Sequence, residues 1–287
     1  MHEDALGRLE TDWNVRPFQI EVLKIFRSFE SLCKKHGLRY YAFGGTALGA
    51  VRHKGFIPWD DDFDVIMPRE DYMVFVRNVQ QELPDGLRFQ RGGEGTASPI
   101  YFGKVVNTDP DIVSRLRKET NLNIIAPPFI DVFVLDGFPV DMRNAKRWWQ
   151  VRRRWRYVQM YRYPQTIHRF GIKVFIARMI GALLSMFYPK TTSNEELMAK
   201  LDDAVLEWPF ATARAVVETA FFKFDSRRVF TPNTFDPARE IAFEDGVIRV
   251  PAKVDELLTR YYGDYMTPPP MEHQIPEHLM RQDYNHV

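Results

Sequence analysis

The chain has 287 residues, of which 45% are hydrophobic and 14% aromatic, so it can bury a core and is not expected to be disordered. Its 39 Lys and Arg residues against 38 Asp and Glu residues give a net charge of +1, which excludes a strong overall attraction to a polyanion. The single cysteine, Cys33, excludes an intrachain disulfide and fits a reducing compartment, and no uncharged apolar run of about 20 residues predicts a transmembrane span.

The first part of the chain, residues 1–140, has the pattern of a small α/β (α+β) domain with a mixed sheet. The periodicity of apolar residues and the positions of Gly and Pro predict first a helix over 15–36, a strand over 38–43 and a brief helix over 46–53 that Thr46 could cap. A strand over 62–67 and a helix over 69–81 follow. Four further strands are expected over 87–90, 101–106, 112–116 and 129–135, and Asp136-Gly137 ends the last of them.

The remainder of the chain differs in character. Residues 142–188 and 194–220 look helical, residues 240–250 predict a hairpin around Asp245-Gly246, and residues 254–262 predict a last helix. We therefore expect three regions: a core over 1–140, a helical region over 141–220, and a segment over 221–287 that packs back on the core.

Two acids lie on one predicted strand. Because side chains alternate between the faces of a strand, Asp62 and Asp64 should share one face, while Phe63 points into the core. Neighbouring carboxylates repel each other unless something neutralises them, and a divalent cation does so. Hard oxygen ligands suit Mg²⁺ or Mn²⁺, so both acids are candidate metal ligands.

A third acid, Asp131, lies within the apolar strand over 129–135. A carboxylate in such a strand needs a partner or a metal ion. With Asp62 and Asp64 it can ligate the metal or act as general base on an acceptor hydroxyl. The alternative for these acids is a solvated loop face or a helix cap.

A glycine pair, Gly44-Gly45, follows a predicted strand and precedes a predicted helix. Such a turn can direct backbone N–H groups at a phosphate, and Thr46 adds a hydroxyl there. The alternative is a simple turn.

Cationic side chains follow this turn. Arg52, His53 and Lys54 can hold the phosphates of a donor, or can merely face solvent at a helix C-terminus. Lys104, in the middle of a predicted strand, can reach the same phosphates or lie on the surface.

These residues together resemble the LicD family, which includes bacterial phosphocholine transferases and is related to the fukutin-type ribitol-phosphate transferases. The resemblance rests on the segment from Gly44-Gly45-Thr46 through His53-Lys54-Gly55-Phe56-Ile57-Pro58-Trp59-Asp60-Asp61-Asp62-Phe63-Asp64, on Phe102-Gly103-Lys104, on Asp131 with Leu135-Asp136-Gly137, and on Tyr261-Tyr262-Gly263-Asp264-Tyr265-Met266. Residues 142–220 match it only in character.

The resemblance implies a nucleotidyltransferase-like core that binds Mg²⁺ through Asp62, Asp64 and Asp131. It further implies transfer of a phosphorylated alcohol, such as phosphocholine, from a CDP-linked donor to a sugar hydroxyl of a glycan or lipid-linked glycan, as in the modification of lipopolysaccharide or teichoic acid. Two alternatives stay open: a nucleotidyltransferase that releases pyrophosphate from a triphosphate, and a non-catalytic, membrane-associated assembly factor.

The segment 143–188 combines cationic and aromatic residues with an apolar run. Between Arg143 and Lys173 it has no acidic residue, and an apolar stretch follows over 174–188. This pattern fits a membrane surface, or a helical hairpin that covers the core; nucleic acid is the least expected partner. We expect a cytoplasmic protein, in the first case at the inner face of the membrane.

Overall fold

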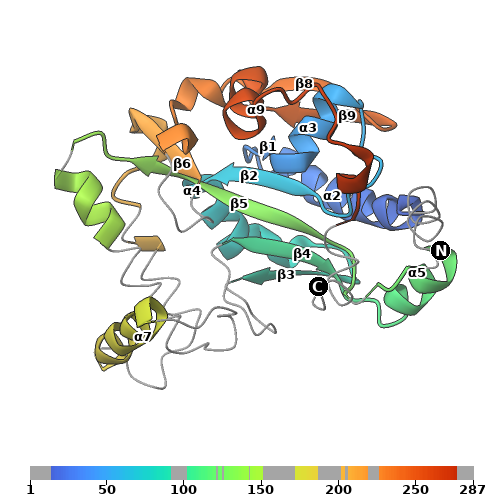
Figure 1. The fold of residues 1–287 in the computed structure, drawn as a ribbon, viewed down its shortest axis with the longest axis horizontal. Helices are drawn as coiled ribbons and strands as arrows, with labels where there is room; N and C mark the ends of the chain where they lie inside the picture. The colour runs from blue at the N-terminus through green and yellow to red at the C-terminus, as the bar shows by residue number, and fades with distance from the viewer. Residues whose placement is uncertain are drawn as a thin grey trace.

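The computed structural model describes residues 14–91, 102–120, 122–124, 126–141, 143–150, 172–186, 202–203, 206–218 and 226–276. At its centre is a mixed sheet that, within these residues, has seven strands (Figure 1). Its strands are β1 (Tyr41–Ala42), β2 (Asp64–Pro68), β3 (Leu87–Arg91), β4 (Gly103–Asn107), β5 (Phe129–Phe138), β6 (Ala215–Glu218) and β7 (Val229–Phe230).

The long strand β5 organises this sheet. Along the order β1-β2-β5-β4-β3, only β2 and β5 are parallel, and the other neighbours are antiparallel. The far end of β5 pairs with β6, which pairs with β7. A second sheet is the hairpin of β8 (Arg239–Phe243) and β9 (Gly246–Val250). The expected α+β class is therefore confirmed.

Helices surround the sheet. They are α2 (Arg16–Lys35), α3 (Gly44–Arg52), α4 (Arg69–Val74), α5 (Ile112–Thr120), α7 (Ile172–Ser185) and α9 (Val254–Tyr262), with one π turn, η1 (Phe75–Val79), and short 3-10 turns at η2 (Gln80–Glu82), η4 (Phe210–Thr212), η5 (Ser226–Arg228), η6 (Pro232–Thr234) and η7 (Met271–His273). Residues 143–150 are also helical.

The core forms between α2 and the sheet. Phe26 and Phe29 on α2 are fully buried, and the rings of Phe26 and Phe63 lie 4.5 Å apart, centre to centre. Cys33 is buried on the same helix, as its spacing indicates. The apolar face of the helix that the sequence predicts over 15–36 is thus the face of α2 that packs on the sheet.

Several elements differ from their predicted form. The predicted strand over 112–116 is the start of helix α5, because Ile112 and Leu116, four residues apart, are the buried pair. The expected strand over 38–43 contains only the two residues of β1. Helix α3 begins at Gly44 rather than after Thr46, and no side chain caps it.

The end of β5 and the region after it also differ. Asp136-Gly137 does not end the strand, which runs on to Phe138 because the Asp136 carboxylate is neutralised by Arg69. Strand β6 falls in the segment 194–220 that was expected to be helical. The predicted hairpin and the last helix, in contrast, are confirmed as β8, β9 and α9.

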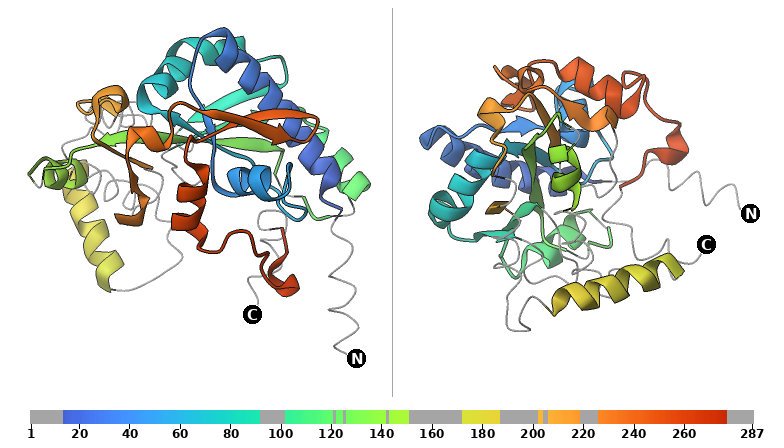
Figure 2. Two further views of the ribbon diagram at one scale, coloured as in Figure 1. Left: turned by 90° about the horizontal axis from the view of Figure 1, so that it is seen from above. Right: turned by 90° about the vertical axis from the view of Figure 1, so that its left-hand side faces the viewer.

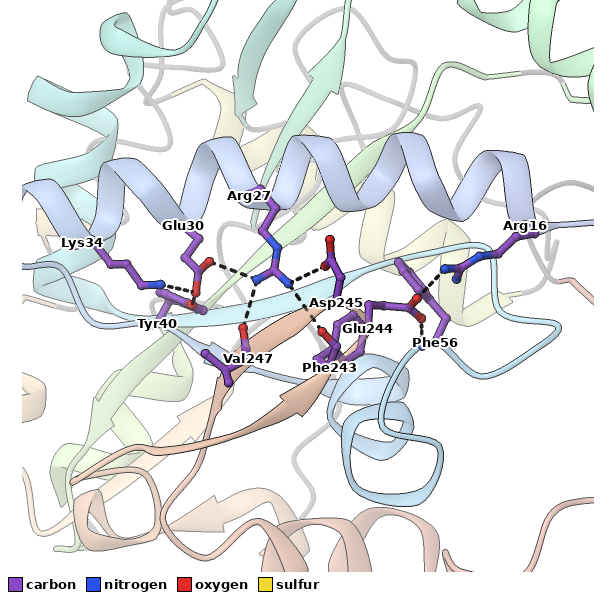
Figure 3. A network of polar contacts seen from close by, with 10 residues as sticks. All are labelled: Arg16, Arg27, Glu30, Lys34, Tyr40, Phe56, Phe243, Glu244, Asp245 and Val247. Atoms are coloured by element: carbon purple, nitrogen blue, oxygen red, sulfur yellow. Dashed lines mark hydrogen bonds and ion pairs between the residues drawn. The ribbon is translucent and has the colours of Figure 1, made fainter.

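The β8–β9 turn fixes the loop that leads into the acidic segment (Figure 3). Glu244 accepts hydrogen bonds from the Arg16 guanidinium at 2.5 Å and from the Phe56 backbone N–H at 3.0 Å. The Glu244 N–H in turn donates to the Lys54 carbonyl at 2.9 Å. The same turn is fixed to α2 by Arg27, whose guanidinium donates to the Val247 carbonyl at 3.0 Å.

Helix α7 lies at the periphery, away from the sheet, in both views of Figure 2. Within the described parts of the chain, none of the helices has the length and hydropathy needed to cross a bilayer.

Candidate active site

Three charged residues lie side by side on adjacent strands. Asp64 on β2 is the register partner of Asp131 on β5, which is the register partner of Lys104 on β4. Register partners project from the same face of a sheet, so the three side chains form a row. Asp62 and Asp64 also line one pocket, although β2 begins only at Asp64 and Asp62 lies in the loop before it, not on the strand expected over 62–67.

That pocket has a volume of ≈ 480 Å³ and is bordered by one side of α3 from Gly45 to Arg52, by the acidic segment, and by the end of α9 with the chain that follows it. Of the predicted site residues, Gly45, Arg52, Asp62 and Asp64 line it. The acidic lining also includes Asp60 and Asp264. Carboxylates therefore outnumber the cations on its wall.

The glycine pair allows the acids to approach the N-terminus of α3. Gly44 has a φ of +51°, and a Cβ atom there would collide with the Asp64 carboxylate. A Cβ atom on Gly45 would lie 2.6 Å from Oδ2 of Asp60. A helix N-terminus favours negative charge, so it helps to hold both carboxylates in place.

Thr46 has a positioning role in this structure. Its hydroxyl oxygen accepts a hydrogen bond from the backbone N–H of Asp64 at 2.8 Å, and the side chain is buried. It thereby ties α3 to the first residue of β2. Its predicted role as a phosphate ligand stays a prediction.

The acids interact electrostatically. Burial and the negative charges of Asp62, Asp131 and Asp60 raise the pKa of Asp64 well above its usual value, and Lys104 opposes this only in part. A carboxylate with a raised pKa in a cluster of acids is a group that a bound cation would stabilise.

The donor set fits Mg²⁺ in a particular way. Within the described ranges, no group of three or more His, Cys, Asp or Glu side chains could hold a metal ion by itself. Protein-bound Mg²⁺ often uses only one or two carboxylates, and water and substrate phosphates complete its shell. Asp62 and Asp64 could hold the ion in that mode, together with a diphosphate.

Asp131 is paired with a cation. Its Oδ1 lies 2.5 Å from Nζ of Lys104, and that ammonium also lies 3.6 Å from the centre of the Phe129 ring. Neither Lys104 nor Asp131 is among the residues that border the pocket, and here Lys104 neutralises an acid instead of reaching toward a phosphate. The expected metal or base role of Asp131 stays a prediction.

The three cationic residues after α3 are in different settings. Arg52 borders the pocket and donates to the Tyr265 carbonyl at 2.8 Å. Burial and the charge of Arg52 lower the pKa of His53, so its ring is neutral near pH 7. Lys54 is exposed, with a φ of +57° at the loop held by Glu244. Arg52 is thus the cation placed to meet a ligand in the pocket.

Sequence reasoning did not assign the other part of the pocket wall. This part of the wall consists of residues that were not candidate site residues: Trp59, Asp60, Tyr262, Asp264 and Tyr265. The signal that could have found the residues after α9 was the Tyr-Tyr-Gly-Asp-Tyr segment starting at Tyr261, whose several aromatic groups surround a glycine and an acid.

This chain is similar to several known proteins. Residues 37–106 match the family model described as LicD/FKTN/FKRP, nucleotidyltransferase domain. The chain is 28% identical over 283 residues to the lipopolysaccharide cholinephosphotransferase LicD of Haemophilus influenzae, an alignment that covers 92% of this chain and 96% of that protein. It is also 37% identical over 120 residues to an uncharacterised protein of Rickettsia prowazekii, over 42% of this chain and 41% of that protein.

Proposed function

Because this chain belongs to the LicD family of phosphotransferases, we propose that it transfers phosphocholine from a CDP-linked donor to a sugar hydroxyl of a lipopolysaccharide-type glycan. The observation that carries the proposal is the grouping of Asp62, Asp64 and Arg52 around one pocket at the N-terminus of α3. This combination can bind a diphosphate and compensate its charge.

Each group has a definite part in the proposed reaction. The diphosphate lies along α3, with one phosphate near Gly45 at the start of the helix and Arg52, from the end of the helix, on the same pocket wall. A divalent cation, held by Asp62 and Asp64, would supply Lewis-acid stabilisation of the phosphate oxygens when bound. Arg52 stabilises the charge that develops on the departing nucleotide.

The bond changes balance without a further reactant. The acceptor hydroxyl oxygen bonds to the phosphorus that carries choline, the bond from that phosphorus to the bridging oxygen breaks, and CMP leaves with the bonding electron pair. The hydroxyl proton passes to a carboxylate, for which we propose Asp131, the neighbour of Asp64 across the β2–β5 pair. Lys104, whose ammonium lies 2.5 Å from Oδ1 of Asp131, holds this carboxylate in position for the step.

A panel of donors tests the proposal. The protein is incubated with Mg²⁺, a lipopolysaccharide acceptor and, separately, CDP-choline, CDP-ethanolamine, CDP-ribitol and CTP, and nucleotide products are separated by chromatography. We expect CMP from CDP-choline and no pyrophosphate from CTP. Pyrophosphate release from CTP without CMP from any CDP-linked donor would support the nucleotidyltransferase alternative, and no product at all would support the assembly-factor alternative.

We also propose that α7 rests on an anionic membrane surface, where lipid-linked glycans are found. Apolar side chains exposed at three- and four-residue spacing form one stripe of this helix: Ile172, Phe175, Ile176, Met179 and Leu183. Phe175 is 64% exposed and Leu183 60%. The helix has no acidic residue, and the half-buried Arg178 matches a negative lipid surface.

The helix over 143–150 also presents cationic side chains that could face an anionic membrane surface. Trp148 is buried against Val217 on β6, while Arg143, Lys146 and Arg147 are exposed. This part of the basic segment packs on the core and leaves its cations outward. The remaining basic residues over 151–171 lie outside the described residues.

Vesicle flotation tests the membrane proposal. We expect the protein to float with vesicles that contain phosphatidylglycerol and to be lost from them in the Phe175→Glu, Met179→Glu double variant. Ile20→Glu, at an exposed apolar position on α2, is the matched control and should float like the wild type. Equal flotation of all three proteins, or none by the wild type, would contradict the proposal.

A further inference from the structure

The pocket that contains the acids also has an aromatic side. Trp59, Tyr262 and Tyr265 border the same ≈ 480 Å³ space as Asp60, Asp62 and Asp64. The sequence has many Phe and Tyr residues, so composition alone cannot select any of them as a ligand group. The structure reduces the aromatic lining of this pocket, within the described residues, to these three.

The two tyrosines are held by the turn that follows α9. Gly263 ends the helix with a φ of +70°, and its N–H donates to the Thr259 carbonyl at 2.9 Å. A glycine is suited to this left-handed conformation, which turns the chain between the two tyrosines. Both tyrosines therefore border one space although the helix ends between them.

Tyr265 is fixed at both ends. Its hydroxyl donates to Asp255 at 2.5 Å, and its backbone carbonyl accepts from Arg52 at 2.8 Å. The bond to Asp255 raises the pKa of Tyr265 to about 12, so the phenol stays neutral. Arg52 thus links the aromatic side of the pocket to α3.

Trp59 is held by a short turn before the acids. Gln19 on α2 donates to the Ile57 carbonyl at 3.1 Å and to the Asp60 carbonyl at 2.9 Å. The ring of Trp59 meets the neutral His53 ring edge to face, with the ring centres 6.3 Å apart. The indole is therefore positioned before any ligand binds.

Tyr262 is the most exposed of the three, at 45%. Burial of its hydroxyl and the charges of Asp64, Asp60 and Asp62 raise its pKa above the usual value, which places this ring within the field of the acids. Asp264, two residues further on, adds another carboxylate to the wall and accepts a hydrogen bond from Thr267.

Aromatic faces next to carboxylates suit one class of ligand in particular. A quaternary ammonium group has a positive charge and an apolar surface of methyl groups, and it has no N–H to donate. Ring faces attract such a cation, and nearby carboxylates add long-range attraction. A primary ammonium would instead need hydrogen-bond acceptors in direct contact.

We propose that Trp59, Tyr262 and Tyr265, with Asp264, bind the quaternary ammonium end of the donor while its diphosphate lies at the start of α3. This inference rests on the proposed function, because it assumes that a CDP-linked donor occupies the pocket. It adds the specificity determinant: the aromatic side selects choline over ethanolamine.

Binding measurements on matched ring-keeping and ring-removing variants test the proposal. Calorimetry with Mg²⁺ and no acceptor gives Kd for CDP-choline and for CDP, which lacks choline. We expect Tyr262→Leu and Trp59→Leu to weaken CDP-choline binding roughly 2- to 30-fold each and to leave CDP binding unchanged. Tyr262→Phe and Trp59→Phe keep a ring and should retain most of the affinity.

The melting temperature of each variant serves as the control for correct folding. Tyr262 is the decisive position because it is the most exposed of the three aromatic residues, at 45%. Its replacement should leave the melting temperature within about 2 °C of the wild type, the size of shift expected for a surface substitution of less than about 0.5 kcal/mol.

The outcomes separate the two proposals. If the wild type binds CDP-choline more tightly than CDP, and Tyr262→Leu and Trp59→Leu do not change that preference, the aromatic subsite is refuted and the proposed function stands. A wild type that binds CDP-choline no better than CDP also refutes the subsite. If the wild type binds no CDP-linked donor, the proposed function itself is refuted.

Discussion

The two ends of the β2–β5 pair show how one sheet treats buried acids in opposite ways. At the far end, Asp136 is fully buried, and the Arg69 guanidinium donates hydrogen bonds to both of its carboxylate oxygens, at 2.6 and 2.9 Å. At the near end, Asp64 and Asp131 face each other in register with Asp62 close by, and the pKa of Asp64 is strongly raised.

The difference between these ends separates a structural acid from a functional one. Arg69 pairs with Asp136 and also donates to Asp202 at 2.6 Å, and Asp202 pairs with Arg91 as well. Two arginines therefore balance two acids, and the network needs no ligand. At the near end Lys104 pairs with Asp131, and the charges of Asp62, Asp131 and Asp60 still raise the pKa of Asp64. Residual negative charge beside an open pocket is what a metal-bound diphosphate would use.

The largest effect is expected at the near end. Asp64→Asn removes a carboxylate that we assign to the cation, and turnover of CDP-choline should fall by several orders of magnitude. The melting temperature of the metal-free variant should equal or exceed that of the wild type, because a repelled, half-buried charge is gone. Steady-state CMP release and calorimetric melting measure the two effects.

The matched control for that variant is Asp85→Asn, the same chemical change at an exposed position. It should have wild-type turnover. Near-normal turnover in Asp64→Asn, with the same fold, would refute the assignment of this acid.

The opposite result is expected at the far end. Arg69→Met leaves Asp136 buried without its main partner, so the free energy of unfolding should fall by about 3–5 kcal/mol. Urea denaturation measures this loss, and Arg239→Met, at an exposed arginine of the hairpin, should change it by less than about 0.5 kcal/mol. A stable Arg69→Met protein would show that this network is not structural.

We expect a divalent cation to stabilise the protein only through the near end, at Asp62 and Asp64. At a free Mg²⁺ concentration of 100 times its Kd, the wild type should gain about 2.7 kcal/mol, read as a higher melting temperature. The Asp62→Asn, Asp64→Asn double variant should gain nothing, while Asp85→Asn should gain as much as the wild type. An equal gain in the double variant would place the cation elsewhere.

The smallest effect concerns Glu244, which holds the loop before the acids. Burial opposes its charge, but the hydrogen bonds from Arg16 and Phe56 lower the pKa of Glu244 overall. A lowered carboxyl pKa stabilises the fold above the usual value of about 4.3 and ceases to do so as pH falls through the folded value.

Urea midpoints against pH measure this contribution. Glu244→Gln should cost about 1 kcal/mol at pH 7, and the difference from the wild type should shrink as the pH falls below about 4. A difference that is constant with pH would indicate that shape, not charge, matters at this position.

The sequence allowed prediction of those features that depend on local periodicity. The alternation around Phe63 places Asp62 and Asp64 on one side, and both border the pocket. The hairpin and the last helix were also predictable, because turn chemistry and an amphipathic pattern are local properties, although the turn is at Glu244-Asp245, one residue earlier than expected.

Features that depend on long-range partners were not predictable. Asp136 was taken to end a strand, because no local pattern shows that Arg69, 67 positions earlier, neutralises it. The pairing of Lys104 with Asp131 depends on the register between β4 and β5. The aromatic side of the pocket needs α9 to pack on α3, which brings residues 262–265 to a site built from residues 44–64.

The most direct test of the central claim is ³¹P NMR of one reaction that contains the wild-type protein, Mg²⁺, CDP-choline and a lipopolysaccharide acceptor. The account predicts that the two diphosphate signals decay together while CMP and a new glycan-linked phosphodiester signal grow in equal amounts. A persistent CDP-choline diphosphate in the presence of active, folded protein, with CTP converted to pyrophosphate in its place, would contradict it.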